Sequence, residues 1–506
     1  MGRESERPEV PLFGNLVQEV KILGIHFCLD GNKKDDLNYK EILSKIKRLL
    51  GWWKQRDLTL MGKVHLLKTY ALSKLNYVSS LILVPKWVYV EVEKLSFEFL
   101  WGGNDRVKRN IMYQDYDYGG MKMTNYTLFV KTQRVMWLKR LIYGEKEMGW
   151  KLYFDYCCKS VGGRLIFLCD YEISKLELNI PRFYLEILKA WQDLKEVRQG
   201  KGKVLNPIIF NNRNICLKGK TVFNCNLYDK GIYFIKDLVF EGLMRPVEHF
   251  QNLGINCEDL FLINDIFKVI QAVLKDNTVV VKSQEVDIAN FDIGLNISEQ
   301  NVMFRDIKSR KVYDYLVKEL RKLFVLQISD NQTVFQFTEK QIIETYSGLR
   351  SMTLIRKHRE FQYKLLHRAI YTKEQLSKFG FVTDNLCSFC HQEVETYIHV
   401  FLNCPKVKEV WQIMIQLFEL TEIATLEWKD IFVGLPGKSI RIKFVNTLIV
   451  MVKYIIFKSR TGSTLPSSRK IQRDILNYRE EEKKLAIKRG KLGLHLQKWE
   501  YIDMLI

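Results

Sequence analysis

The sequence lacks an apolar run long enough to cross a membrane. A membrane-spanning helix needs about 20 consecutive, predominantly apolar residues. The nearest stretch, FVNTLIVMVKYIIF from Phe444 to Phe457, is shorter and contains Asn446 and Lys453. We therefore predict a buried helix in this stretch, and we expect no membrane partner.

Signals for export and lipid attachment are also missing. The first twenty residues contain no apolar core of a secretory signal, and Glu6 stands where a myristoylation signal has Ser or Thr. The 10 cysteines are scattered without the spacing of a disulfide framework. We therefore expect reduced thiols, an intracellular protein of the nucleus, the cytoplasm or both, and a disordered N-terminal segment over residues 1–19.

Acidic residues are too few to balance the basic ones. The chain has 79 Lys and Arg against 58 Asp and Glu, a net charge of +21. This excess recurs along the whole sequence and attracts polyanions, nucleic acid first and an anionic membrane surface second. Basic surfaces also serve solubility, so the charge favours a nucleic-acid partner without identifying one.

Hydrophobic periodicity predicts a mainly α fold with minor β structure, divided into several domains. Ile42, Ile46, Leu49 and Trp53 recur at helical spacing, which indicates one face of a helix in the core. Thr59 is a candidate N-cap for the next helix. From about residue 116 to 330 the pattern mixes helices with short strands, and beyond that it is helical again.

Four residues have the spacing of zinc ligands: Cys387-x2-Cys390-x8-His399-x4-Cys404. A Cys-x2-Cys pair places two sulfurs on one tight turn, which is how most structural zinc sites begin. Four protein ligands leave no position for water or substrate, so we predict a structural zinc ion and no catalysis there. His391 is a competing ligand, but it directly follows Cys390. The alternative is a helix-turn region with free thiols.

The stretch LCSFCHQEVETYIHVFLNCPKVKEVWQIM resembles the zinc-binding domain that follows the reverse transcriptase of LINE-type non-LTR retrotransposons. The four ligands match that pattern, and Pro405 and Trp411 match its flank. Upstream, VKILGIHF resembles the end of the polymerase palm, and NYKEILSKIKRLLGWWKQRDLTLMGKVHLLK is similar to the thumb. The resemblance implies these segments: 20–115 end of palm and thumb-like helical domain, 116–330 mixed α/β middle region, 331–440 small helical zinc-binding domain, and 441–506 C-terminal helices with a basic tail.

The catalytic carboxylates of such polymerases are not visible. The family holds two Mg²⁺ ions with carboxylates from two palm motifs, one of them an aromatic-x-Asp-Asp hairpin. Asp35 and Asp36 in GNKKDDLNY are flanked by polar residues, which predicts a solvated loop. We therefore predict no catalytic residue here, and Mg²⁺ only in a full-length polymerase.

The leading hypothesis is a retrotransposon-derived fragment that binds nucleic acid. The resemblance implies that it grips template RNA and target DNA, with basic side chains on phosphates and an exposed Trp stacked on a base. The alternatives are a truncated gene model of an RNA-directed DNA polymerase, and a host-recruited interaction protein or non-functional remnant. For either tryptophan the alternative is a place in the core. The candidate contacts are Lys45, Arg48, Trp52, Trp53 and Lys54, and Arg356, Lys357, His358 and Arg359.

Overall fold

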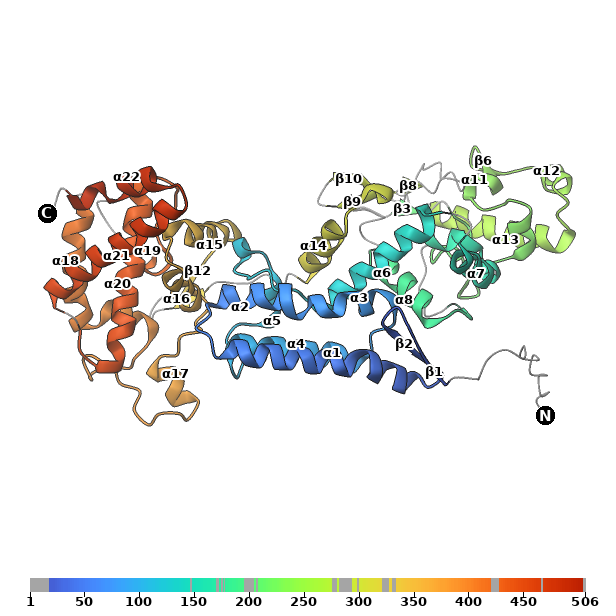
Figure 1. Cartoon of the computed structure of the whole chain (residues 1–506). Helices are drawn as coiled ribbons and strands as arrows, with labels where there is room; N and C mark the ends of the chain where they lie inside the picture. The colour runs from blue at the N-terminus through green and yellow to red at the C-terminus, as the bar shows by residue number, and fades with distance from the viewer. Residues whose placement is uncertain are drawn as a thin grey trace. The chain divides into compact units, whose positions relative to one another are not determined.

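The computed structural model is mainly helical with small two-stranded sheets, which confirms the expected fold class (Figure 1). The expected disordered segment 1–19 lies almost entirely outside the described residues. No helix within the described ranges combines the length and apolarity that a membrane span requires. The structure describes residues 18–145, 148–169, 173, 176, 178–194, 204–205, 208–274, 280–281, 294–297, 300–320, 327–329, 334–419, 427–465 and 467–503.

The chain forms two compact units, and each is assembled from three separate segments. The segment 20–115, expected to hold the end of the palm and the thumb, contributes to both units. Unit 1 comprises Met1–Asn38, Asn76–Tyr89 and Tyr126–Val317, and unit 2 comprises Tyr39–Leu75, Val90–Asn125 and Lys318–Ile506.

Unit 1 begins with an antiparallel hairpin of β1 (Glu19–Ile22) and β2 (Ile25–Cys28). The two residues between the strands, Leu23 and Gly24, both have positive φ, as a type I′ turn requires. VKILGIHF therefore forms two strands. The Asn38 side chain fixes this hairpin to helix α1 (Gly31–Lys54), because it exchanges hydrogen bonds of 2.9 and 2.8 Å with the backbone of His26.

The prediction of a solvated loop at Asp35 and Asp36 is wrong. Both residues lie within α1, and both are partly buried. Burial raises the pKa of Asp35, with Lys34 opposing the shift and Asp36 adding to it. The polar sequence around them suits a helix start as well as a loop, so local composition did not distinguish the two.

The buried side chain of Arg134 connects separate helical segments of unit 1. Its guanidinium is buried and donates to the carbonyl oxygens of Ser79 and Ile82, at 2.8 and 2.7 Å, at the end of helix α3 (Ser73–Leu81). It also pairs with Glu186 at 2.9 Å. These bonds satisfy carbonyls that the end of a helix leaves without partners. Buried residues between Val135 and Leu316 together form one large apolar core in this unit.

Unit 1 carries most of the short strands. They pair as β4 (Cys216–Leu217) with β5 (Lys220–Thr221), β6 (Val239–Phe240) with β7 (Leu243–Met244), β9 (Gly294–Ile297) with β10 (Gln300–Met303), all antiparallel, and β3 (Val204–Leu205) with β8 (Val280–Val281), parallel. Its helices and helical turns are α6 (Tyr126–Tyr143), α7 (Gly149–Cys158), Lys159–Val161, Gly163–Phe167, α8 (Arg182–Gln192), α10 (Cys225–Asp229), α11 (Ile235–Leu238), α12 (Val247–Asn252), α13 (Cys257–Leu274), Phe304–Asp306 and α14 (Ser309–Glu319), the last of which ends across the unit boundary.

Unit 2 contains most of α1, and the buried face of this helix differs by one residue from the expected one. Leu43, Ile46 and Leu50 are the buried positions, whereas Leu49 and Trp53 are partly exposed. The prediction of Thr59 as an N-cap is confirmed, because its hydroxyl accepts from the amide of Gly62 at 3.2 Å at the start of α2 (Leu60–Leu66). A π-helical turn, Leu67–Ala71, follows.

The prediction of a buried helix around Phe444–Phe457 is also confirmed by α20 (Ile440–Ser459). Lys453 is fully buried in it and donates to the carbonyl oxygen of Phe432 at 3.0 Å. The remaining elements of unit 2 are α4 (Lys86–Trp101, shared with unit 1), α5 (Arg109–Tyr113), Tyr116–Tyr118, β11 (Gln327–Ser329) paired with β12 (Val334–Gln336), α15 (Glu339–Met352), α16 (Arg356–Leu366), α17 (Lys373–Lys378), His399–Asn403, α18 (Pro405–Glu419), α19 (Trp428–Val433), Arg460–Gly462, α21 (Ser468–Lys488) and α22 (Leu492–Asp503).

Candidate metal centre and nucleic-acid surfaces

The first two ligands lie on a tight turn that the backbone closes by itself. The amide of Cys387 donates to the carbonyl of Glu393 at 2.7 Å, and the amide of His391 donates back to Cys387 at 3.0 Å. His391 completes the turn with a φ of +55°, the left-handed conformation. This turn directs the thiols of Cys387 and Cys390 to one side.

The other two ligands flank a π-helical turn, His399–Asn403. The amide of Cys404 donates to the carbonyl of His399 at 2.8 Å and closes that turn. Pro405 then begins α18. A π-helical turn holds one residue more than an α-helical turn, so the x4 spacing of His399 and Cys404 is accommodated within a single wide turn.

The four ligand atoms form one cluster of Cys387, Cys390, His399 and Cys404, all within 4.8 Å of one another. The sulfurs of Cys387 and Cys404 are 3.8 Å apart, and the sulfur of Cys390 is 3.3 Å from His399 Nε2. Tetrahedral zinc with Zn–S bonds of about 2.3 Å separates two sulfurs by about 3.8 Å. The side chains therefore fit Zn²⁺, and His391 is not part of the cluster.

A second layer of groups orients these ligands. His399 Nδ1 lies 2.9 Å from the carboxylate of Glu393, which favours the tautomer whose Nε2 lone pair faces the cluster. The amide of Phe389 donates to the sulfur of Cys387 at 3.5 Å. Such bonds stabilise thiolate charge, which three cysteines on one Zn²⁺ leave in excess.

Glu395 connects the cysteine turn to the rest of unit 2. Its carboxylate is fully buried and accepts from the amide and hydroxyl of Ser388, at 2.9 and 2.5 Å, and from the amide of Lys373 at 2.9 Å. Arg460, just after α20, pairs with it. Burial alone would raise the pKa of Glu395, but Arg460 and the hydrogen bonds of Ser388 hold that pKa below its usual value.

Without a bound metal, the three cysteine thiols differ in pKa. Burial raises the pKa of Cys387 to about 12, and it also raises the pKa of Cys404. Burial opposes ionisation of Cys390 as well, but the backbone amides of Gln392 and Glu393 lower its pKa to about 7. A bound Zn²⁺ deprotonates coordinating thiols outright.

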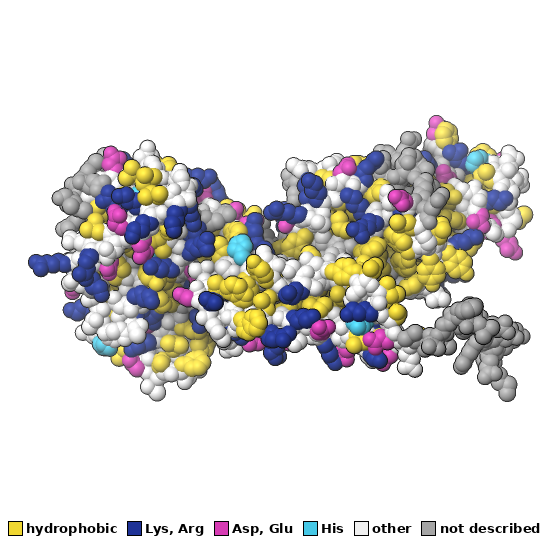
Figure 2. Space-filling view, viewed as in Figure 1, with side chains coloured by type: hydrophobic (Ala, Val, Ile, Leu, Met, Phe, Trp, Pro, Cys, Tyr) yellow, Lys and Arg dark blue, Asp and Glu magenta, His cyan; other side chains and the backbone are white. Residues whose placement is uncertain are grey.

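The predicted contacts on α1 lie mostly in solvent. Lys45, Arg48, Trp52 and Lys54 are exposed, and the Trp52 side chain is 68% exposed. Lys45 pairs with Glu41 at 2.6 Å, and Lys54 pairs with Glu98 at 2.7 Å. Basic side chains recur among apolar and acidic ones over the face drawn in Figure 2.

On α16 the structure separates the four predicted contacts. Arg356 and Lys357 are exposed, and Arg359 is partly buried. His358 is only 4% exposed and stacks on Tyr478, with ring centroids 5.0 Å apart. The prediction of His358 as a nucleic-acid contact is therefore wrong. Helical spacing turns this residue toward the core while its neighbours face outward.

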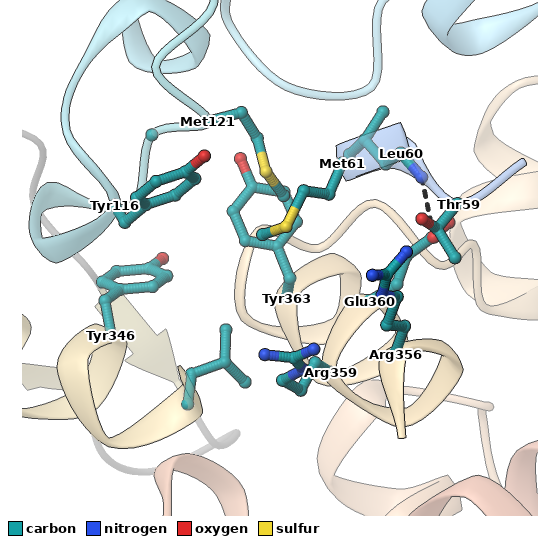
Figure 3. Close-up of a pocket in the computed structure, with 12 residues that line it drawn as sticks. Thr59, Leu60, Met61, Tyr116, Met121, Tyr346, Arg356, Arg359, Glu360 and Tyr363 are labelled. Carbon is teal, nitrogen blue, oxygen red and sulfur yellow. Dashed lines mark hydrogen bonds between the residues drawn. The ribbon is translucent and has the colours of Figure 1, made fainter. Parts of the chain in front are cut away.

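The sequence did not reveal two features of unit 2. One is Glu395, for which the only signal was its position among acidic residues between the ligand pairs. The other is a pocket lined by residues of α2, α15, α16 and the Tyr116–Met121 segment (Figure 3). Its walls come from segments up to about three hundred residues apart, as the 2.8 Å bond from the amide of Leu60 to Glu360 illustrates.

Comparison with known proteins agrees with this geometry. Residues 334–411 match the family model described as zinc-binding in reverse transcriptase. The chain is 21% identical over 514 residues to the transposon TX1 uncharacterized 149 kDa protein of Xenopus laevis, an alignment that covers 90% of this chain and 38% of that protein. The chain thus spans well under half the length of its relative. The chain thus has distant similarity to a transposon protein, and its Cys387, Cys390, His399 and Cys404 cluster lies within the segment that matches a zinc-binding domain of the reverse-transcriptase type.

Proposed function

We propose that this chain is the nucleic-acid-binding C-terminal portion of a LINE-type reverse transcriptase. It grips template RNA and target DNA, while the catalytic palm lies in another part of the full protein. The observation that carries this proposal is one exposed face of α1, where Lys45, Arg48 and Trp52 stand three and four residues apart. Residues with this spacing lie one above the other along a helix.

This exposed face of α1 is suited to bind single-stranded nucleic acid. Trp52 is 68% exposed, and leaving so large an apolar ring in water forgoes the stabilisation that burial would give. A stacked base would cover it, while Arg48 and Lys45 meet the flanking phosphates. The surface ion pair of Lys45 with Glu41 is no obstacle, because such exposed pairs contribute about 0–1 kcal/mol.

The zinc ion would be structural in this function. Cys387, Cys390, His399 and Cys404 supply four protein ligands, which completes a tetrahedral sphere. The cluster holds no carboxylate of the kind that aligns Mg²⁺ in a polymerase. We therefore propose no polymerase chemistry for this chain, and primer extension by it with Mg²⁺ would contradict us.

Reduced zinc-binding thiols also suit the nucleus or cytoplasm, where we place this protein.

The test is binding of fluorescent single-stranded RNA and DNA to the full chain at several salt concentrations. Affinity should fall steeply with salt, and Arg48→Glu should reduce the slope by about 1. Trp52→Ala should cost about 1–3 kcal/mol of binding at every salt concentration. Lys268→Glu, a charge reversal at another exposed position, on α13, is the matched control and should leave strand affinity nearly unchanged. An affinity for single-stranded RNA and DNA that does not vary with salt would contradict the proposal.

A further inference from the structure

Helix α7 of unit 1 (Figure 1) carries two exposed tyrosines beside a groove. Phe154 and Cys158 are fully buried and hold the helix on the core, whereas Tyr153 and Tyr156 are 50 and 78% exposed. The two tyrosines are three residues apart, so they lie on the same side of the helix. Because two aromatic rings in water forgo the stabilisation of burial, this side of α7 is a candidate binding surface.

The groove beside these tyrosines is large enough for a ligand. Its volume is about 720 Å³, within the range of about 300–1,000 Å³ that is typical of ligand pockets. Three segments form its walls: α7 with the helical turn that follows it, residues 179–181 directly before α8, and α10. All three belong to the segment Tyr126–Val317, so the groove lies within one compact unit.

Hydrogen bonds and ring contacts hold the walls of the groove in place. The Tyr184 hydroxyl of α8 donates to the carbonyl of Trp150 at 2.7 Å, and the ring centroids of Tyr184 and Tyr153 are 6.4 Å apart. The Asn224 side chain caps α10 and donates to Asp259 of α13 at 2.8 Å. A groove that is already ordered loses little conformational entropy when it binds a ligand.

The charges of the groove are balanced, although the whole chain carries a net charge of +21. Among the described residues that line it, Lys159 is the one cation and Asp229 the one anion. A strand of nucleic acid binds through several phosphates and requires a surplus of cations. The balanced lining therefore favours a ligand with little charge over a polyanion.

The tyrosine wall has the length of a short polyproline II segment. From Tyr153 to Lys159 the wall advances by about 9 Å, at the helical rise of about 1.5 Å per residue. The two prolines of a Pro-x-x-Pro segment in polyproline II lie on one face, also about 9 Å apart, because this helix rises about 3.1 Å per residue with three residues per turn. Such a segment would cover both tyrosines at once.

A proline-rich segment also matches the hydrogen-bonding groups of the groove. Proline has no N–H, so a proline-rich backbone presents carbonyl oxygens that need donors. Hydroxyl and amide groups of the lining can donate to them, on Tyr156, Ser160, Asn179 and Tyr228. The exposed carboxylate of Asp229, at the end of α10, can pair with one basic side chain beside the prolines.

From these features we propose that the groove binds a proline-rich segment of a partner protein, with its prolines on Tyr153 and Tyr156 and one basic residue paired with Asp229. Grooves lined by aromatic residues recognise polyproline II because that helix is already extended before it binds. The proposal goes beyond the proposed function, since the groove lies in unit 1 and does not use the Lys45, Arg48 and Trp52 face of α1.

The experiment is fluorescence anisotropy of the full zinc-loaded chain with a labelled octapeptide of two alanine-proline-proline units followed by alanine and arginine. Replacing one proline of each unit by glycine makes the peptide flexible and should weaken binding at least tenfold. Tyr156→Ala should weaken binding of the proline peptide about tenfold. The matched control is Tyr70→Ala, at a tyrosine of unit 2 that is 61% exposed, and it should change binding less than twofold.

Asp229→Asn tests the charged contact separately. It should weaken binding of the arginine peptide about threefold and leave binding of the same peptide ending in alanine unchanged. Equal affinity for the glycine-containing peptide, an equal loss in Tyr70→Ala, or an equal effect of Asp229→Asn on both peptides would each contradict the proposal. Displacement of the peptide by an eight-nucleotide oligouridine would assign the groove to nucleic acid instead and would also overturn it. Strand binding is tested on α1, so its salt dependence would stand or fall independently of these results.

Discussion

At the scale of single residues, His358 shows how the core of unit 2 depends on pH. The imidazole lies between Tyr454 and Tyr478, with ring centroids 4.5 and 5.0 Å away. Burial, helped by the charge of Lys357, lowers its pKa to about 3, although Glu482 opposes the shift. His358 is therefore neutral in the fold, whereas the unfolded chain takes up its proton below the ordinary pKa near 6.5.

Because the unfolded state binds the extra proton, stability falls as pH drops through 6.5 toward 3. We expect His358 to contribute a loss of about 1.4 kcal/mol per pH unit in this window. His358→Phe should be less sensitive, so its urea midpoint relative to wild type should rise from pH 7.5 to pH 5.5. His65→Phe, at an exposed position of α2, is the control and should show no such rise. Identical pH profiles for wild type and His358→Phe would contradict the prediction.

At the scale of elements, the cysteine turns depend on one buried ion pair. Glu395→Gln would leave Arg460, whose side chain is only 13% exposed, without its charged partner. Removing one member of a buried pair costs about 3–5 kcal/mol. We expect that loss in urea unfolding of unit 2, and Glu374→Gln, which breaks an exposed pair with Lys378, should cost less than about 1 kcal/mol. Equal stability of the two variants would show that Glu395 is not the link.

Elements also divide into those that the sequence predicts and those that it does not. The cap at Thr59, the helix start at Pro405 and the four zinc ligands were predictable, because each depends on residues a few positions apart. Whether His358 points inward depends on α21, whose Tyr478 lies far along the chain. The pocket between α2, α15 and α16 has the same limitation, since Met61 and Arg359 meet only after folding.

At the scale of the whole molecule, the division into two compact units predicts a local response to metal removal. The zinc cluster belongs to unit 2, and unit 1 has its own apolar core and the buried Arg134 that closes α3. A zinc site that forms with the fold contributes its binding energy to folding. A strong chelator should therefore loosen the cysteine turns and leave the core of unit 1 folded.

Hydrogen exchange read by mass spectrometry would measure this response. The amides of Cys387, His391 and Cys404 are bonded within the turns, and they should exchange faster once zinc is removed. Peptides from α6 and α8 should keep their protection. Cys387→Ser should resemble the chelated protein, whereas Cys158→Ser, a buried thiol outside the cluster, should retain zinc and normal exchange at residues 387–404. Loss of protection in both units at once would mean that zinc stabilises the whole chain, and unchanged exchange at the turns would mean that the cluster folds without metal.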